Sequence, residues 1–426
     1  MKINLMFLLL ITFNPLIICD YDVYKNQFSI FFKRDFKKSK GEKHLGDEAI
    51  NNLFYNSIYS IIYINNDRNP LSLFLSFNNS DIKIISTPSK KFPEEKATFT
   101  FLKSYQRLNL SFLLMEPNND PNTNNSLLGL SLHNNDKNKF SFINQLKENK
   151  IIERRIFSVL YKENSITAES SNDGEILFGL FPHEMTSRYS EKDLNWVSII
   201  DKDLWKIKFD EVKFSGEENS ISINEVEFDL GMNLILGPEE YRIKIYENFF
   251  KKQIESKLCK EEIFFNKRDN QFYITYSCEM DLEVEVFPTL SFYNKDLNYS
   301  IVLDYYQLLC IFERKIYFKV VFKKKVENKK WIFGRSFMEI YPLVFDVDNM
   351  KIGFYKVEFN MDHPFLLSFF LIMIIIIMAI AFYRGSELLK KENEEKKEKQ
   401  KEKKEILEKE EKIKDIDNEK TKLKNE

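Results

Sequence analysis

The feature that most limits the fold of this chain is a series of short apolar runs separated by turn-forming residues. The runs are rich in Phe, Tyr, Ile and Val, and several alternate apolar with polar residues at period two. This period is typical of half-buried β-strands, because successive side chains of a strand point to opposite faces. The clearest runs are SIYSIIYI, LSLFLSF, ATFTFL, NLSFLLM, GEILFGLF, EVEFDL, QFYITYSC, KIYFKVVF and LVFDVD. We therefore expect a mostly β body.

Two segments of the body favour short helices, residues 141–150 and residues 238–254. The second segment begins with Pro238, followed by Glu239 and Glu240. Proline and acidic residues both suit the first turn of a helix. With 426 residues the chain is long enough for two domains or for one two-lobed unit.

The N-terminal end of the chain differs from the body. Lys2 precedes an apolar stretch from Met6 to Ile18, so residues 1–19 are interpreted as a secretory signal peptide. Residues 20–50 include the basic stretch FKRDFKKSKGEK. This region is either a prosegment remnant, whose lysines would pair with acids of the body, or a flexible leader.

The C-terminal end predicts a membrane anchor. Residues 364–383 carry no charge, and twenty residues at ~1.5 Å each span roughly 30 Å, the thickness of a bilayer's hydrocarbon core. Arg384, Lys390 and Lys391 follow this stretch, which favours a cytosolic tail. We therefore expect a single-pass type I protein of the secretory pathway or plasma membrane, with its body lumenal or extracellular.

The tail, residues 384–426, consists largely of Lys and Glu at three- and four-residue spacing. This pattern is typical of a solvated helix. Ile406, Ile413, Ile416 and Leu423 also fall at heptad-like positions, which leaves a coiled-coil partner as an alternative.

Several classes of function find no support in the composition. The net charge of −2 gives no reason to expect a nucleic-acid partner. The four histidines, His44, His133, His183 and His363, show no spacing for a metal site. The chain has neither a Gly-rich phosphate loop nor a Cys-x-x-Cys pair. We therefore expect no metal and no cofactor.

An internal repeat suggests that the body contains two related lobes. LFLSFNNSD contains Asn78 and VEFDLGMN contains Asp229, 151 positions later. Each stretch has an apolar residue, a variable residue, Phe and then Asn or Asp before a polar turn. A repeat that occurs twice at this distance favours duplicated lobes over a solenoid.

The second stretch and its surroundings resemble the pepsin-like aspartic peptidases. Asp229 is followed by Gly231, Gly237 and Pro238, as the family's catalytic aspartate is in the second lobe. Further similar segments are LLGL, IIERRIFSVLY, GEILFGLF, LNWVSIIDKDLWKIKFDEVKFSG and WIFGRSFMEIYPLVFDVDNMKIGFYK. The resemblance implies an all-β bilobal fold with a few short helices, an N-terminal lobe at residues 51–184 and a C-terminal lobe at residues 185–357.

The resemblance also implies a pair of catalytic aspartates that share one proton across the lobe junction. Asp229 matches one of them, although a turn residue that only binds backbone groups is the alternative. Asn78 stands at the other position, and an amide cannot accept a proton at neutral pH. Asn79, Ser80 and Gly231 match the turns of the substrate cleft. Asp81 and Asp67 are the carboxylates nearest in sequence that could replace the missing acid.

The remaining assignments concern the flap, the cysteines and the glycosylation sites. Phe101 falls at the position of the family's flap tyrosine, with Tyr105 as an alternative. The resemblance implies a disulfide between Cys278 and Cys310, which would leave Cys259 as a lone thiol. Asn109, Asn124 and Asn298 begin glycosylation sequons. Asn78 begins one too, but we expect it to be buried between the lobes.

Two functions follow from these observations. The first is a peptide-binding or protein-binding pseudopeptidase that keeps the family's cleft but has lost its chemistry, because Asn78 replaces a catalytic aspartate. The alternative is an active aspartic endopeptidase that uses Asp229 with an unrecognised partner. In both cases a polypeptide is the expected ligand.

Overall fold

The computed structural model describes residues 28–34, 58–65, 67, 69–86, 96–101, 107–117, 125–132, 138–161, 174–215, 220–266, 271–312, 314–324 and 328–356. Beyond these it describes only positions 378, 383–384, 396–397, 399–401 and 403–404. The chain divides into two units, Met1–Val357 and Glu358–Glu426. All elements below belong to the first unit.

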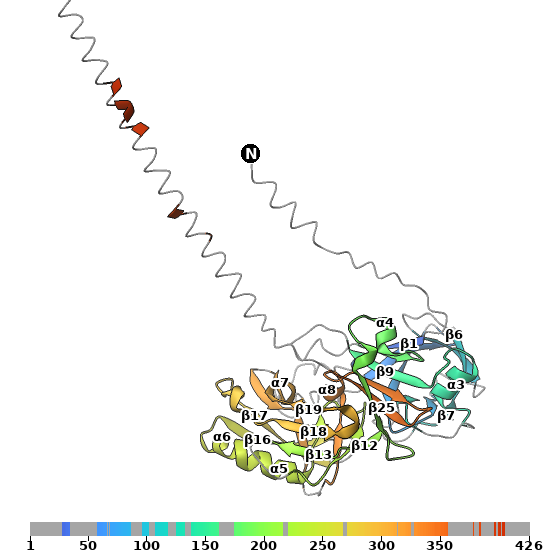
Figure 1. Cartoon of the computed structure of the whole chain (residues 1–426). Coiled ribbons are helices and arrows are strands. Elements are labelled where there is room, and N and C mark those ends of the chain that lie inside the picture. The colour runs from blue at the N-terminus through green and yellow to red at the C-terminus, as the bar shows by residue number, and fades with distance from the viewer. Residues whose placement is uncertain are drawn as a thin grey trace, which may run out of the picture. The chain divides into compact units, whose positions relative to one another are not determined.

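The strands of the first unit form three sheets, and most of the predicted apolar runs lie on them (Figure 1). The largest sheet has 13 strands and holds the N-terminal lobe. Its strands are β1 (Phe28–Arg34), β2 (Ile58–Ile64), β3 (Leu71–Ser76), β4 (Ile82–Ile85), β5 (Lys96–Phe101), β6 (Arg107–Ser111), β7 (Leu113–Met115), β8 (Ser126–Gly129), β9 (Ile156–Tyr161), β10 (Gly174–Phe178), β11 (Leu194–Ser198), β24 (Leu343–Asp346) and β25 (Lys351–Tyr355).

The C-terminal lobe contains the other two sheets. The 9-stranded sheet consists of β12 (Lys206–Lys208), β14 (Glu225–Phe228), β15 (Ile235–Leu236), β16 (Cys259–Asn266), β17 (Gln271–Cys278), β20 (Leu309–Phe312), β21 (Lys315–Phe318), β22 (Val320–Lys323) and β23 (Trp331–Phe333). The 3-stranded sheet consists of β13 (Glu211–Phe214), β18 (Leu290–Asn294) and β19 (Tyr299–Leu303). The prediction of a mostly β body is thereby confirmed.

Short helices connect these strands, and both predicted helical segments contain one. Residues 141–150 include α3 (Phe142–Glu148), and residues 238–254 include α5 (Glu239–Ile245) and the π-helical turn η2 (Tyr246–Phe250). The others are α4 (Pro182–Met185), α6 (Lys251–Glu255), α7 (Tyr305–Leu308), α8 (Arg335–Met338), η1 (Glu191–Asp193), η3 (Val284–Val286) and η4 (Lys295–Leu297).

Part of residues 20–50, interpreted from the sequence as a prosegment remnant or a flexible leader, is a strand of the large sheet. Strand β1 lies between β10 and β2 in the large sheet and is antiparallel to both. Phe28, Ile30 and Phe32 are buried, at 0–1% exposure. They alternate with less buried residues, so the period-two pattern places one face of β1 in the core. The N-terminal lobe therefore includes residues well before position 51.

The two lobes share the large sheet. Strand β24, which comes late in the chain, pairs with β9 of the N-terminal lobe and with β25, and β25 pairs with β11. Phe345 on β24 is fully buried and stacks on Phe157 at a centroid distance of 4.9 Å. It also contacts Phe77 at 4.9 Å and Phe228 at 6.2 Å, one residue from each lobe. An aromatic core thus joins the lobes.

An ion-pair cluster at the surface links β24 to the N-terminal lobe. Asp348, just after β24, accepts hydrogen bonds from the Arg155 backbone N–H at 2.9 Å and from Arg155 Nε at 2.7 Å. Lys147 Nζ on α3 adds a contact of 3.2 Å. Burial alone would raise the pKa of Asp348, but the hydrogen bonds from Arg155 and Lys147 outweigh it and lower the pKa below its usual value.

We expect Asp348→Asn to destabilise the protein by about 1 kcal/mol at pH 7 and by much less near pH 2. The lowered folded-state pKa means that ionised Asp348 contributes stability above its unfolded pKa, about 3.9, and that this contribution is lost as the pH falls through the folded pKa. Urea unfolding of both proteins at pH 7, 4 and 2 measures the difference. Asp296→Asn, at an exposed aspartate, is the matched control. A difference that stayed constant down to pH 2 would contradict the assignment.

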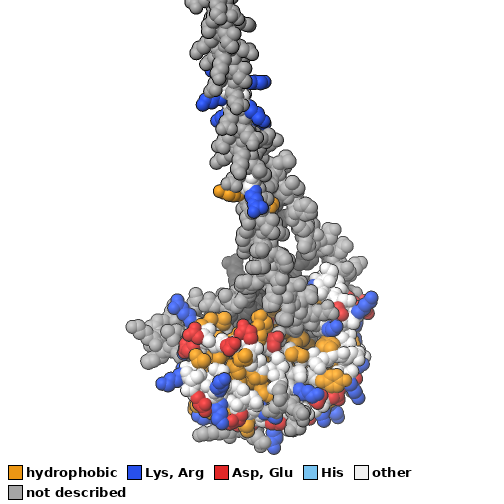
Figure 2. All heavy atoms as spheres, turned by 60° about the vertical axis from the view of Figure 1, so that its left-hand side comes forward, with side chains coloured by type: hydrophobic (Ala, Val, Ile, Leu, Met, Phe, Trp, Pro, Cys, Tyr) orange, Lys and Arg blue, Asp and Glu red, His pale blue; other side chains and the backbone are white. Residues whose placement is uncertain are grey.

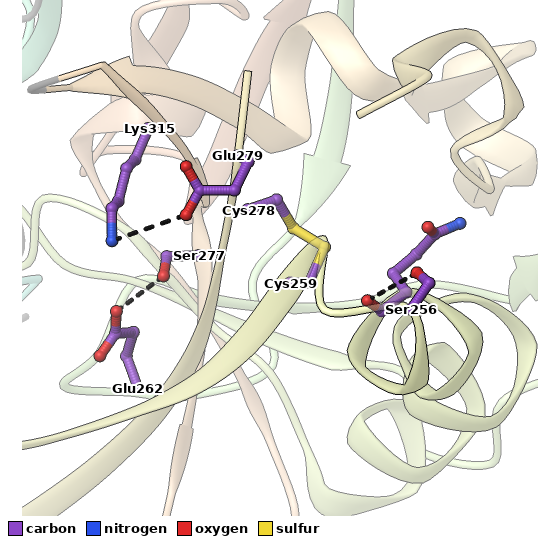
Figure 3. The surroundings of a disulfide bond; sticks show 8 residues. Ser256, Cys259, Glu262, Ser277, Cys278, Glu279 and Lys315 are labelled. Atoms are coloured by element: carbon purple, nitrogen blue, oxygen red, sulfur yellow. Dashed lines mark hydrogen bonds and ion pairs between the residues drawn. A yellow bond between two sulfur atoms is a disulfide. The ribbon is translucent and has the colours of Figure 1, made fainter. Parts of the chain in front are cut away.

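The predicted disulfide between Cys278 and Cys310 is wrong, because Cys278 is bonded to Cys259 (Figure 3). Cys259 and Cys278 lie directly opposite each other on the antiparallel strands β16 and β17, with Cα atoms 4.0 Å apart. Cys310 lies on β20, and β21 separates β20 from β17. Two strand spacings amount to roughly 9–10 Å, beyond the ~7 Å that a disulfide can bridge. Cys310 is a half-buried thiol.

The surface of the first unit mixes apolar side chains with acidic and basic ones on the face shown in Figure 2. Exposed apolar side chains on the C-terminal lobe include Ile263, Phe272 and Ile311. Among the residues that the structure describes, no helix is both long and apolar enough to cross a bilayer. The predicted signal peptide and most of residues 364–383 and of the tail lie outside those residues.

Candidate functional site

The stretches with Asn78 and Asp229 occupy corresponding places in the two lobes. In the N-terminal lobe, β3 leads into the turn with Asn78, β8 runs parallel to β3, and β4 pairs antiparallel with β8. In the C-terminal lobe, β14 leads to Asp229, β23 runs parallel to β14, and β15 pairs antiparallel with β23. The two lobes therefore build the same three-stranded arrangement around these two residues, in agreement with the internal repeat.

Each turn passes close to a glycine at the end of the parallel strand. A Cβ atom on Gly129 would lie 2.4 Å from the Asn79 carbonyl oxygen. A Cβ atom on Gly334 would lie 2.2 Å from the Leu234 carbonyl oxygen. Such distances exclude any side chain without a shift of the backbone. Both glycines thus allow the turns to cross the strand ends and reach the lobe junction.

The structure brings Asn78 and Asp229 into contact. Asn78 Nδ2 donates to Asp229 Oδ2 at 3.4 Å, the long end of the hydrogen-bond range. The Gly231 backbone N–H donates to Asp229 Oδ1 at 2.8 Å. Asp229 is partly buried and Asn78 is exposed. The expectation that Asn78 is buried is therefore wrong, because its turn ends at the open side of the junction.

Burial raises the pKa of the Asp229 carboxyl, and the charge of Glu227 adds to the increase. Hydrogen bonds from Gly231 and Asn78 and the positive charge of Arg335 oppose it, but the balance is still upward. The partner needed for shared-proton catalysis is nevertheless an amide here, which cannot accept a proton.

Two charged residues near Asp229 were not predicted from the sequence. Glu227 precedes Asp229 by two residues, is 6% exposed and pairs with Lys330 Nζ at 2.5 Å. Arg335 follows Gly334 at the start of α8 and is 1% exposed. A charged residue inside the otherwise apolar segment WIFGRSF was the available signal for Arg335. For Glu227, the available signal was the period-two alternation of acidic and apolar residues in the segment EVEFD.

Neither of the other candidate acids replaces the missing carboxylate. Asp81 Oδ1 accepts hydrogen bonds from Asn138 Nδ2 at 2.6 Å and from Ser80 Oγ at 3.0 Å. Asp67 Oδ1 caps its own turn by accepting from Asn69 N at 3.0 Å. The groups with the largest influence on the Asp229 carboxyl are Gly231, Glu227, Asn78 and Arg335, and neither Asp81 nor Asp67 is among them.

Asn79 and Ser80 form hydrogen bonds that hold the turn together. Asn79 Oδ1 accepts from Asp81 N at 3.0 Å, and the Asn79 carbonyl accepts from Ser131 N at 2.8 Å. Ser80 Oγ accepts from Asn138 Nδ2 at 3.3 Å. The sequence resemblance placed Asn79 and Ser80 at the substrate, whereas these contacts show them closing the loop.

The assignment of Phe101 to the flap is wrong. Phe101 ends β5 with 0% exposure, and its ring packs edge-on against Phe28 at 5.4 Å and tilted against Phe142 at 6.0 Å. Both of these rings belong to the core, so Phe101 points inward because it continues the buried face of β5. Tyr105, the alternative, lies outside the described residues.

The glycosylation candidates stay predictions. Asn109 on β6 is exposed, and its side-chain oxygen accepts from Thr98 Oγ1 at 2.6 Å. Asn298 is also exposed and has a left-handed backbone conformation, with φ 57°. Asn124 lies outside the described residues.

Comparisons with known proteins agree with this geometry. A family model described as eukaryotic aspartyl protease matches residues 106–357, a range that contains Asp229 and begins after Asn78. Cathepsin E of Aquarana catesbeiana is 25% identical over 224 residues, which cover 51% of this chain and 49% of that protein. Pregnancy-associated glycoprotein 2 of Bos taurus is 25% identical over 182 residues, 42% of this chain and 41% of that protein.

The chain thus spans about half, or less, of the length of these curated relatives. The family model, however, covers more than half of the chain and includes the whole described C-terminal lobe. This protein therefore belongs to the eukaryotic aspartyl protease family.

Proposed function

We propose that this protein is a catalytically impaired member of its family that binds polypeptides at the lobe junction without cleaving them. The observation that carries the proposal is the contact of 3.4 Å between Asn78 Nδ2 and Asp229 Oδ2, where the mechanism requires two carboxyls. Without a second carboxyl, no partner acid can exchange a proton with Asp229 through an attacking water. Binding of a polypeptide needs only the shape and hydrogen bonds of the junction.

The proposal includes the location of the molecule. A signal peptide at residues 1–19 and a span at residues 364–383 would make it a single-pass protein of the secretory pathway or plasma membrane, with its lobes lumenal or extracellular. A Lys/Glu-rich tail at residues 384–426 would then face the cytosol, where it could bind a coiled-coil partner.

An active endopeptidase is the second candidate, and Glu227 is the observation in its favour. Glu227 is the ionisable group whose charge acts most strongly on Asp229. It lies two residues before Asp229, on β14, and is already paired with Lys330. A general base bound to an ammonium group is a poor proton acceptor, so this arrangement favours the binding function.

The test combines binding with cleavage. The purified protein is mixed with a fluorescently labelled, unfolded polypeptide between pH 4 and 7. We expect saturable binding by fluorescence anisotropy and an intact polypeptide on gels. Asn78→Trp, which adds bulk at the exposed position, should weaken binding at least about tenfold, an effect of about 1.4 kcal/mol. Asn109→Trp is the matched control.

Three results would contradict the proposal. Cleavage that disappears in Asp229→Ala would establish an active enzyme. Cleavage that instead disappears in Glu227→Gln, with folding intact by circular dichroism, would identify Glu227 as the unrecognised partner. Binding that Asn78→Trp and Asn109→Trp leave equally strong would place the polypeptide elsewhere on the surface.

A further inference from the structure

The hydrogen-bonding groups at the Asn78–Asp229 site are unequally divided between donors and acceptors. Asn78 Nδ2 donates one hydrogen to Asp229 Oδ2 at 3.4 Å, and the Gly231 N–H donates to Oδ1 at 2.8 Å. An ionised carboxylate has about four lone-pair positions, and these two contacts use two of them. The carboxylate therefore keeps acceptor capacity toward the open side of the site.

The orientation of the Asn78 amide adds a further acceptor. If the amide were turned over, its oxygen would face the carboxylate oxygen, and two acceptors would repel each other. The observed orientation avoids this repulsion and leaves Asn78 Oδ1 available. Since Asn78 is exposed, this oxygen can meet a ligand. The site thus presents acceptors from both lobes, while the Gly231 N–H and one Asn78 amide hydrogen are directed to Asp229.

The neighbouring charges leave Asp229 as the accessible anion of the site. Glu227 on β14 is buried and paired with Lys330, so its charge is compensated. Arg335 on α8 is 1% exposed, so its guanidinium is not available to a ligand, and its positive charge offsets part of the increase in the pKa of Asp229. Of these four charges, Asp229 is the one that lies beside the exposed Asn78.

A negatively charged site that is rich in hydrogen-bond acceptors favours ligands with donors and positive charge. A family member with two carboxyls carries one protonated acid that can donate to the carbonyl oxygen of a peptide bond. At this site Asn78 replaces that acid, so a carbonyl oxygen would face the acceptor oxygens of Asp229 and Asn78. An ammonium or guanidinium group carries several donors and a positive charge, which match both acceptors at once.

The geometry points to a site for a cationic group of a polypeptide, held between Asp229 and Asn78 Oδ1. The group is a lysine or arginine side chain, or an N-terminal ammonium. This inference rests on the proposed binding of polypeptides at the lobe junction, and it names the class of polypeptide. A basic residue, and not a scissile bond, then occupies the position between the two lobes.

The experiment measures binding of octapeptide pools to the full-length protein at pH 7. The pools are N-acetylated and random except at one central position, which is Arg, its uncharged isostere citrulline, Lys or norleucine. We expect the Arg and Lys pools to bind about tenfold tighter than their uncharged counterparts, as for a charge-assisted hydrogen bond. A norleucine pool with a free N-terminus tests whether an N-terminal ammonium is held instead.

Two variants locate the cation. Asp229→Asn keeps the shape of the side chain but removes its charge, and should abolish the preference for Arg over citrulline. Glu225→Gln removes an acid from the same strand, where Glu225 is paired with Lys206 at the surface, and should leave the preference unchanged. A preference that survives Asp229→Asn would place the cation elsewhere and overturn the inference.

The outcomes also separate this inference from the proposed function. Equal binding of charged and uncharged pools, in both N-terminal forms, would overturn the cation site while polypeptide binding itself stands. If no pool bound, and the unfolded polypeptide did not bind either, the proposed function would fail and the inference with it.

Discussion

Asn78→Asp should switch on proteolysis at acidic pH. The substitution places a second carboxyl beside Asp229, and two carboxyls at this distance cannot both ionise, so they share one proton and titrate as a unit. General acid–base catalysis of this kind contributes ~10²–10⁴-fold, and we expect a gain of that order in the rate of cleavage of an unfolded protein. The measurement is pepstatin-sensitive cleavage between pH 3 and 6.

The control for this prediction is Asn78→Asp combined with Asp229→Asn, which restores one carboxyl and one amide in the opposite order. This double variant should cleave no faster than the natural protein. If Asn78→Asp folds normally and still does not cleave, the missing carboxyl is not the sole defect. The next group to substitute would then be Arg335, whose buried positive charge opposes the increase in the pKa of Asp229.

Phe345→Ala should destabilise the first unit by about 3–5 kcal/mol, the usual range for deleting a buried phenylalanine ring. Phe345 is fully buried and contacts Phe77 and Phe228, the residues that directly precede Asn78 and Asp229. The cavity would therefore open beneath both turns at once. Equilibrium unfolding in urea measures the loss of stability.

A matched substitution separates the cavity from the loss of aromatic stacking. Phe345→Leu keeps most of the volume, and we expect a loss of less than about 1.5 kcal/mol. If Phe345→Ala cost no more than Phe345→Leu, the aromatic contacts would not be what joins the lobes. At denaturant concentrations where Phe345→Ala remains folded, its polypeptide binding should also weaken, because the two turns depend on the same ring.

The sequence predicted the parts of the site that depend on local pattern. The alternation of apolar and polar residues along LSLFLSF and EVEFDL predicted two strands. The repeated Phe-Asn and Phe-Asp pairs predicted a turn after each strand. The contact of Asn78 with Asp229 then followed from the duplicated lobes. Local alternation is readable because a strand's side chains point to opposite faces with period two, whatever lies around it.

Other features depend on which strands become neighbours. Cys259 and Cys278 face each other across β16 and β17, while β21 separates Cys278 from Cys310. The spacing of cysteines in the chain contains no information about this register. Strand β1 likewise became part of the lobe only by pairing with β10, some 140 residues later in the chain.

The sequence by itself thus determined that this chain forms β-sheet lobes in duplicate and that an amide replaces one of two expected carboxyls. The tertiary structure alone decided that Asn78 is exposed, that Phe101 faces the core, and that Glu227 and Arg335 bear on the charge of Asp229. Residue identity and the local period of apolar residues can be read directly from the sequence. Exposure and electrostatic environment are properties of atoms brought together from distant segments, and they exist only once those segments have packed.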